Sequence, residues 1–243
     1  MSKFLFLLLI TILSIHKFKF TSMITENDKL SDVIARNIDL LPIIHRLGLS
    51  TNIGERYIRE VCSDQVKDVN FILVILNTYS SDNYFPKPDD LELKPLIDFL
   101  TQTHTYHKQV TIPRLYGFIQ QLKQNLPNEK LLLVIEKYLN QYIKKLIQHI
   151  DFEEKDIFPL VNKKKMVHEK SVNIKKLFRQ HTNVENEISD LKTIIIRHIP
   201  LNANMDLIHD LLHTLSHFEK EQLDHARFED KILIPKLLNL LSN

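Results

Sequence analysis

Cysteine, glycine and tryptophan are scarce in this chain, and each scarcity excludes a class of protein. The single cysteine among 243 residues is Cys62, so one chain can form neither an internal disulfide nor a cysteine-based zinc or iron–sulfur site. Three residues are glycine and none is tryptophan, whereas strand-rich folds need many glycine-bearing turns. Long runs rich in Leu, Ile, Lys and Glu instead predict an all-α protein.

The chain also lacks a large excess of charge of either sign. The chain has 32 basic and 30 acidic residues, with a formal net charge of +2. Apart from three lysines at 163–165 there is no basic block, so the pattern does not predict binding to nucleic acid. Histidine is abundant, with twelve residues, which a metal site would explain. A single cysteine suits a reducing compartment, and we expect a cytoplasmic protein.

The amino-terminal segment has a signal-like pattern. Residues 4–15 form an apolar run after Lys3, which is the layout of a secretory signal but too short to span a bilayer. Basic and bulky residues follow at 16–20, where signal cleavage would need small side chains. We therefore expect the functional protein to begin at Met23 and its first helical unit at residue 27, so that residues 1–26 are an extension before that unit. We expect no membrane span; a working signal at 4–15 would imply export.

Two helical units are predicted after this extension. Residues 27–79 contain capping residues, then apolar residues at helical spacing up to Gly48, which should end the first helix, and further helices at about 55–62 and 66–77. Residues 80–90, with two prolines, form a linker. Residues 91–243 hold four long helical patterns, at about 91–124, 129–161, 172–198 and 205–241, and Pro235 should kink the last or restart its final turn.

A motif in the second long helix returns in the fourth. Residues 149–159 are HIDFEEKDIFP and residues 225–235 are HARFEDKILIP, so His, Phe, Glu, Lys and Pro are identical. Each copy places a histidine and a glutamate four residues apart, one above the other on a helix face. We therefore expect His149 with Glu153, and His225 with Glu229, each to form half of a metal site.

A further histidine precedes each copy at nearly the same distance: His104 before His149, and His181 before His225. Two equivalent hairpins predict an antiparallel four-helix bundle with one metal-binding layer across its core. Four imidazoles and two carboxylates suit two iron ions bridged by the glutamates, whereas one zinc ion needs only four ligands. A bundle without metal has no reason to bury six ionisable groups.

Neighbouring polar residues are weaker candidates. His107 lies one turn from His104, and we expect it to support a ligand or to lie at the surface rather than to bind metal. Glu185, one turn after His181, could add a carboxylate near the metals. A single helical histidine is usually a surface or core residue, so these positions depend on the repeat around them.

The polar residues around the two motif copies allow several interpretations. His217 and Glu221 share a helix face with His225, where they could orient ligands, line an access path or simply be solvated. Glu154 and Asp230 follow the two motif glutamates, and we expect both to be exposed partners of neighbouring lysines.

The pattern over residues 91–241 resembles a haemerythrin-like domain. Oxygen-carrying haemerythrins have His-x3-His on their third helix and His-x4-Asp on their fourth, whereas this chain has glutamate at 185 and His225-x3-Glu229. The set of four histidines and two glutamates is more similar to the repair-of-iron-centres family (ScdA and YtfE). In that family the first ligand lies in a His-x2-His stretch, here His104-Thr-Tyr-His107, which favours His104.

The amino-terminal unit resembles the small helical domain of the same family through Leu30-Ser-Asp-Val-Ile-Ala-Arg36. That domain carries a Cys-Cys-Gly-Gly turn, which is Asn52-Ile53-Gly54-Glu55 in this chain. Both thiols are therefore missing, and Cys62 lies about two turns into the following helix. This departure puts in doubt the steps that need the cysteine pair, which are thiol redox chemistry and the holding of iron in transit.

The resemblance implies a non-haem di-iron protein of the nitric oxide and oxidative stress response. Its two iron ions would carry an oxo or hydroxo bridge and two bridging glutamates, and would bind nitric oxide, dioxygen or peroxide. Cluster repair, with damaged iron–sulfur proteins as partners, or nitric oxide and dioxygen chemistry would be its use. The alternatives are a non-enzymatic sensor or binding module for these ligands or iron, and a helical adaptor without metal. The expected ligands are His104, His149, Glu153, His181, His225 and Glu229.

Overall fold

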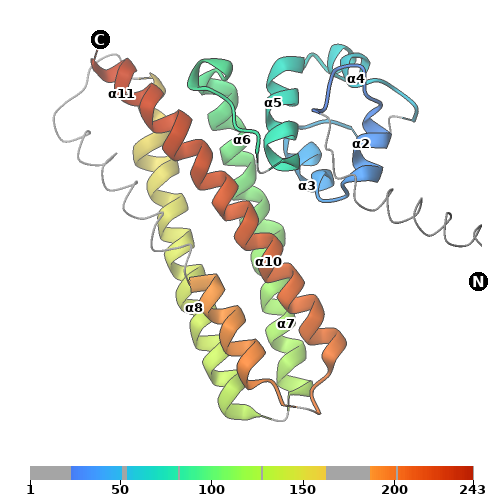
Figure 1. The fold of residues 1–243 in the computed structure, drawn as a ribbon. Helices are drawn as coiled ribbons and strands as arrows, with labels where there is room; N and C mark the ends of the chain where they lie inside the picture. The colour runs from blue at the N-terminus through green and yellow to red at the C-terminus, as the bar shows by residue number, and fades with distance from the viewer. Residues whose placement is uncertain are drawn as a thin grey trace, which may run out of the picture. The chain divides into compact units, whose positions relative to one another are not determined.

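A computed structural model describes residues 23–50, 54–81, 83–126, 128–162, 187–200 and 202–242. These residues form helices and connecting turns without a β-strand; one isolated bridge joins Lys29 and Tyr57. The all-α fold predicted from the sequence is confirmed (Figure 1). The chain divides into two compact units, Met1–Pro86 and Lys87–Asn243. No helix among the described residues is both long and apolar enough to cross a membrane.

The described part of the first unit contains four short helices around a small apolar core. They are α2 (Leu30–Arg36), α3 (Leu40–Arg46), α4 (Ile58–Asp64) and α5 (Val69–Ser80). Leu30, Ile44, Ile58 and Ile75 are each fully buried, and each such side chain contributes about 1.5–3 kcal/mol of transfer free energy. Asp68 caps α5 by accepting hydrogen bonds from the backbone of Asn70 and Phe71, so that helix begins where a capping residue occurs.

The prediction of one helix up to Gly48 is wrong, because the chain breaks between α2 and α3. Asn37 is extended, with φ −145° and ψ 92°. A continuous helix would place the Pro42 ring against the Ile38 carbonyl, four residues earlier. In α3, Pro42 instead lies in the first turn, where no N–H is needed. Gly48 does end α3: it has φ +70°, and the Leu49 N–H donates to the Ile44 carbonyl at 3.1 Å, which closes the helix end.

Helix α4 ends in the same way but with valine in the left-handed position. Val66 has φ +52°, and its side chain is 92% exposed. A β-branched side chain there is strained by roughly 1–2 kcal/mol. We expect Val66→Gly to raise the free energy of unfolding by about 0.5–1 kcal/mol, as measured by chemical denaturation. Val66→Ala keeps a Cβ atom at positive φ and should gain clearly less; equal gains would show that strain is not the cause.

The second unit is the predicted bundle, and its helices follow the predicted boundaries closely. The 3₁₀ turn η1 (Pro88–Asp90) leads into it. The first long helix consists of α6 (Leu93–Tyr106), the π turn η2 (His107–Thr111) and α7 (Ile112–Asn125). The second consists of α8 (Glu129–Phe152), the π turn η3 (Glu153–Ile157) and the 3₁₀ turn η4 (Phe158–Asn162). The last consists of α10 (Met205–Phe228), the π turn η5 (Glu229–Leu233) and α11 (Ile234–Ser242).

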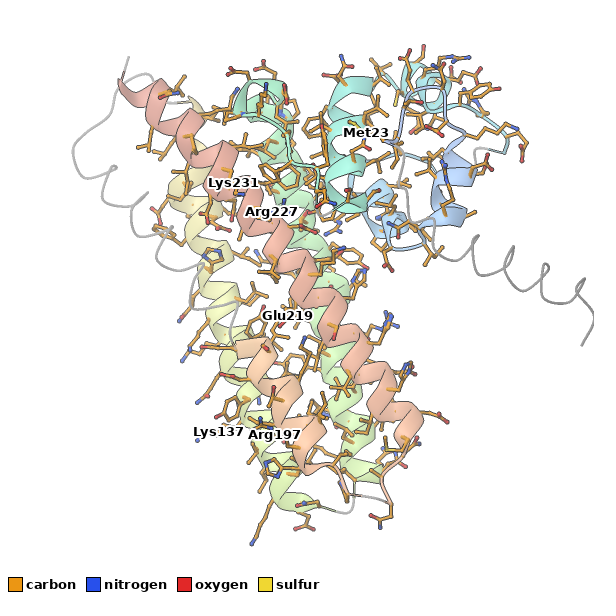
Figure 2. All side chains as sticks on the ribbon, in the orientation of Figure 1. Met23, Lys137, Arg197, Glu219, Arg227 and Lys231 are labelled. Carbon is orange, nitrogen blue, oxygen red and sulfur yellow. The ribbon has the colours of Figure 1, made fainter. Side chains whose placement is uncertain are left out.

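Residues 187–198 form the described part of the third long helix. The rest of that predicted helix, with His181 and Glu185, lies outside the described residues. Apolar side chains from all four helical segments meet in one core; examples are Leu115, Ile143, Ile195 and Leu211. Charged side chains such as Lys137, Arg197 and Lys231 are exposed (Figure 2). This separation of apolar and charged faces is what the helical periodicity predicted.

Each described π turn begins six residues before a proline. Proline has no N–H to donate, and its ring clashes with the carbonyl four residues before it, so a regular α-helical turn cannot continue through it. The wider π turn accommodates the proline without ending the helix. The first residues of these turns and their prolines are His107 with Pro113, Glu153 with Pro159, and Glu229 with Pro235. The repeated proline thus places both motif glutamates at the start of a π turn.

Candidate metal centre

Five of the six residues predicted as ligands are described, and the fold brings them together. His104 lies in the last turn of α6, His149 near the end of α8, and His225 near the end of α10. Glu153 and Glu229 are fully buried at the starts of η3 and η5. All three histidines are also buried. The sixth predicted ligand, His181, lies outside the described residues.

Four of these side chains form a tight cluster. One ligand atom from each of His104, Glu153, His225 and Glu229 lies within 4.8 Å of the others. The Nε2 atoms of His104 and His225 are 3.2 Å apart, and His225 Nε2 is 3.2 Å from Glu229 Oε1. Two ligand atoms about 2.1 Å from one cation, and at right angles to each other, would also be about 3 Å apart. The spacing therefore fits ligands arranged around a metal ion.

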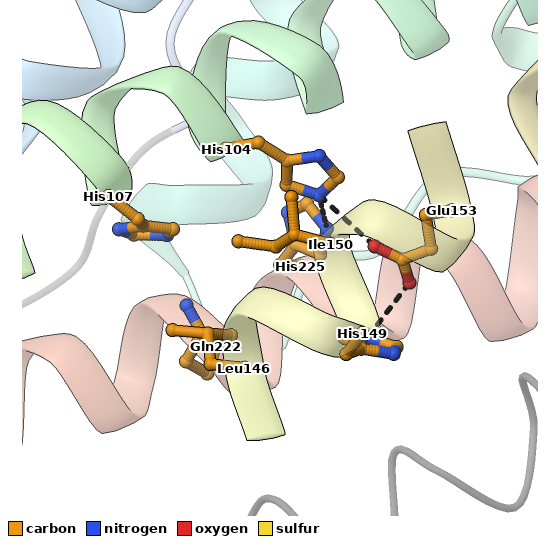
Figure 3. A pocket seen from close by; sticks show the side chains of 8 residues that line it. All are labelled: His104, His107, Leu146, His149, Ile150, Glu153, Gln222 and His225. Atoms are coloured by element: carbon orange, nitrogen blue, oxygen red, sulfur yellow. Dashed lines mark hydrogen bonds and ion pairs between the residues drawn. The ribbon is translucent and has the colours of Figure 1, made fainter. Parts of the chain in front are cut away.

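Glu153 lies between two histidines from different helices (Figure 3). Its Oε2 atom is 3.2 Å from His104 Nε2, and its Oε1 atom is 2.8 Å from His149 Nε2. The two oxygens of one carboxylate thus face two separate imidazoles. This arrangement is suited to a carboxylate that bridges two ions.

A small cavity adjoins the cluster, with polar groups and apolar side chains in its wall (Figure 3). Leu146 and Ile150 supply apolar surface. The buried Nδ1 atom of His225 and the Nε2 atom of Gln222 have no hydrogen-bond partner among the described residues. Buried polar atoms of this kind occur where a further polar group or ion binds. The residues that line the cavity are His104, His107, Leu146, His149, Ile150, Glu153, Gln222 and His225.

His104 is held from outside the cluster as well. Its Nδ1 atom is 3.0 Å from Glu154 Oε1, and its ring stacks on Phe158 with centroids 5.5 Å apart. Burial lowers the pKa of His104, but hydrogen bonds to Glu153 and Glu154 outweigh it and raise the pKa to about 9. Metal binding at Nε2 would therefore displace a proton.

Glu154 and Asp230 are not the exposed residues that were expected, because both are half-buried. Glu154 bonds to His104 and also to Lys108, which comes from the first long helix rather than from its own. The hydrogen bond from His104, together with that from Lys108, holds the pKa of Glu154 below its usual range despite partial burial. Glu154 is therefore a charged carboxylate in direct contact with the cluster.

His107 and Glu221 are buried instead of lying on a solvated face, and His107 lines the cavity. His107 Nδ1 is 3.3 Å from Thr111 Oγ1 and 4.0 Å from Glu221 Oε2. His107 lies outside the four-residue cluster and is buried, so the surface alternative is wrong and the supporting role stays a prediction. The spacing of His107 from Pro113 equals that of Glu153 from Pro159, and this signal in the sequence could have indicated an inward position.

The sequence profile of the Hemerythrin HHE cation binding domain matches residues 96–237. The chain belongs to this family. The matched span contains every described member of the cluster and confirms the resemblance to haemerythrin-like domains. No curated protein matches the chain, and the narrower resemblance to the repair-of-iron-centres family stays a prediction.

The donor set of this haemerythrin domain fits a metal ion of the imidazole- and carboxylate-binding class, to which iron belongs. Three buried histidines and two buried carboxylates supply nitrogen and oxygen donors, and no sulfur donor adjoins them among the described residues. Without a cation, two carboxylates in one buried cluster would repel each other and lose hydration. The family and the cluster together indicate a metal-binding module.

Proposed function

We propose that this haemerythrin domain holds two iron ions and acts on nitric oxide, dioxygen or peroxide in the cytoplasm. The observation that carries the proposal is Glu153, whose two carboxylate oxygens face imidazoles from two helices. Glu229 is its counterpart in the repeated motif and is equally buried. The proposed ligands are the five described residues of the centre together with His181.

When bound, a pair of iron ions would supply electrons to a small ligand. The protein's part is to hold the ions, to orient the histidines and to keep bulk water away. Leu146, Ile150 and Phe158 form apolar surface next to the histidines, so a small uncharged ligand is favoured over a large polar one. Glu153 and Glu229 supply negative charge that offsets the cations.

The first unit does not offer the thiol chemistry that the repair-of-iron-centres resemblance would bring. Cys62 is 1% exposed, and burial raises the pKa of its thiol, so it stays protonated and is a poor metal ligand. This favours nitric oxide or dioxygen chemistry over thiol-dependent transfer of iron to damaged iron–sulfur proteins. A sensor that binds these ligands without turnover uses the same centre and is the second candidate.

Iron content tests the proposal directly. We expect two iron ions per full-length chain, measured by elemental analysis and Mössbauer spectroscopy, because Glu153 is placed to bridge. Glu153→Ala should bind less than a tenth as much iron. Glu136→Ala removes the ion pair with Lys123 elsewhere on α8 and should load like the wild type. Failure of iron-replete wild-type protein to hold iron would refute the proposal.

Turnover separates the enzyme from the sensor. Reduction of two nitric oxide molecules to nitrous oxide and water consumes two electrons and two protons, so a chemical reductant must be supplied without oxygen. Nitrous oxide in excess of the iron present indicates an enzyme. A spectral change on addition of nitric oxide, with no product beyond one turnover, indicates a binding module.

A further inference from the structure

Glu154 connects the cluster to a positive charge on another helix. It lies in η3, next to Glu153, and its Oε1 atom is 3.0 Å from His104 Nδ1. On the opposite edge of that ring, His104 Nε2 is 3.2 Å from both Glu153 and His225. One imidazole therefore has the cluster on one side and Glu154 on the other.

The contact with Glu154 favours one of the two neutral forms of the His104 ring. An ionised carboxylate only accepts hydrogen bonds, so Glu154 draws the proton of a neutral ring to Nδ1 at 3.0 Å, in competition with Glu153 at 3.2 Å from Nε2. Nε2 is then free of its proton and able to bind a cation. The Phe158 ring, stacked at an interplanar angle of 9°, limits rotation of the imidazole. Two neighbours thus select both the tautomer and the orientation.

Lys108 holds the Glu154 carboxylate in place. Its Nζ atom lies 3.3 and 3.2 Å from the two carboxylate oxygens of Glu154 and 3.8 Å from Asp151 Oδ1. Because Lys108 is one helical turn after His104, the first long helix supplies both the imidazole and the cation. The positive charge also draws electron density from the carboxylate, which weakens its pull on the Nδ1 proton.

The other described histidine at the heart of the cluster has no such support. His225 Nδ1 is buried without a hydrogen-bond partner among the described residues. The two histidines whose Nε2 atoms meet at 3.2 Å are therefore not equivalent. Selection of the tautomer from outside is a property of His104.

We propose that Glu154 is a positioning residue that fixes the Nδ1–H tautomer of His104 and strengthens it as a metal ligand, with Lys108 moderating this effect. The inference rests on the proposed metal centre but concerns a residue outside the ligand set. A carboxylate behind a ligating histidine raises the basicity of that ligand, and its loss typically weakens metal binding 10- to 100-fold.

The tautomer is tested first in metal-free, full-length protein labelled with ¹⁵N-histidine. Long-range ¹H–¹⁵N spectra distinguish Nδ1–H from Nε2–H, and His104→Gln identifies the signal. At a pH where the ring is neutral, we expect mainly Nδ1–H in the wild type and a shift toward Nε2–H in Glu154→Ala, where Glu153 still accepts at Nε2. Glu154→Gln, whose amide oxygen still accepts, should return the ring to Nδ1–H. The same tautomer in wild type and Glu154→Ala would overturn the proposal.

Iron binding is the second test, and it does not depend on assignment of the spectra. We expect Glu154→Ala to release iron to a chelator about 10- to 100-fold faster than the wild type. Glu154→Gln should restore most of the retention but raise the reduction potential of the centre, because the negative charge is gone. Lys108→Met should lower that potential. Far-UV circular dichroism confirms that each variant remains helical.

The control variant is Glu136→Ala, which breaks a lysine–carboxylate pair between two helices at 2.9 Å without touching a histidine. Release as slow as in the wild type from Glu154→Ala, or equally fast release from Glu136→Ala, would refute the positioning role. A wild type that holds no iron but keeps the Glu154-dependent tautomer would instead refute the proposed function alone. The two failures are thus distinguishable.

Discussion

Glu229→Gln is expected to stabilise the metal-free protein and to destabilise the iron-loaded protein relative to the wild type. Glu153 and Glu229 are both fully buried, and without a metal ion their charges repel within one cluster. The positive charge of His104, whose pKa is about 9, offsets this repulsion only in part. Glutamine has nearly the same shape without the charge. Replacement of buried charge by a neutral isostere commonly gains stability, and we expect about 1–2 kcal/mol in the free energy of unfolding of metal-free protein.

Loading with iron should reverse this order. A ligand that binds only the folded state adds roughly 2.7 kcal/mol when its free concentration is one hundred times its dissociation constant. The wild type gains this increment, whereas Glu229→Gln loses a charged ligand and should gain little of it. Chemical denaturation with and without iron, monitored by far-UV circular dichroism, measures both quantities. Chelation of the wild type should return its metal-free value.

Glu136→Gln serves as the control because it removes one negative charge from the same bundle outside the cluster. It should leave the gain on iron loading unchanged. If Glu229→Gln gained as much from iron as the wild type, Glu229 would not be a ligand. If it weakened the metal-free protein, buried repulsion would not be the dominant electrostatic effect. The buried charge of Glu229 would then not lower the stability of the metal-free protein.

The cluster could be predicted because its sequence motif is short and occurs twice. Spacing of four residues places His149 beside Glu153, and His225 beside Glu229, on any helix. Repetition of the motif predicted the second half of the metal site. The two upstream histidines indicated which residues of the two hairpins lie at the same level of the bundle. His104 accordingly meets His225 at 3.2 Å across the bundle, although 121 residues separate them.

The partners of the cluster residues could not be predicted in the same way. Glu154 was expected to pair with nearby lysines at the surface, but Lys108 and His104 reach it from another helix. Such a contact depends on the rotation of two helices about their axes, which helical spacing alone does not fix. Each π turn also shifts the helix face that follows it, so periodicity drifts just where the site begins.

The break before α3 shows a different limit. Apolar residues at helical spacing favoured one helix up to Gly48, although Pro42 lies within that span. In the structure the helix breaks before Pro42. A proline in a helix interior costs about 3 kcal/mol of stability, which is more than one additional helical turn would contribute. Where a proline interrupts an apolar pattern of helical period, the steric clash of the proline ring determines where the helix ends.

Phe218→Ala is expected to cause the largest loss of stability of any single change considered. Phe218 is 1% exposed in α10 and lies edge-on to Tyr142 of α8, with ring centroids 5.9 Å apart. Its ring also lies edge-on to that of His107, with centroids 5.0 Å apart. Truncation of such a ring leaves a cavity that the surrounding helices cannot fill, and we expect a cost of about 3–5 kcal/mol.

The position of Phe218 makes this change informative about function as well. Phe218 belongs to the apolar core, and its ring packs edge-on against His107, which lines the cavity. Its loss would therefore let His107 move and admit water next to the cluster. Phe218→Leu keeps most of the volume and should cost less than about 1.5 kcal/mol, with normal iron retention. Leu133→Ala, at a side chain that is 65% exposed on α8, should change stability by no more than about 0.5 kcal/mol. Equal effects of Phe218→Ala and Leu133→Ala in urea denaturation would mean that the bundle relaxes around the lost ring, and that the apolar wall does not hold the site together.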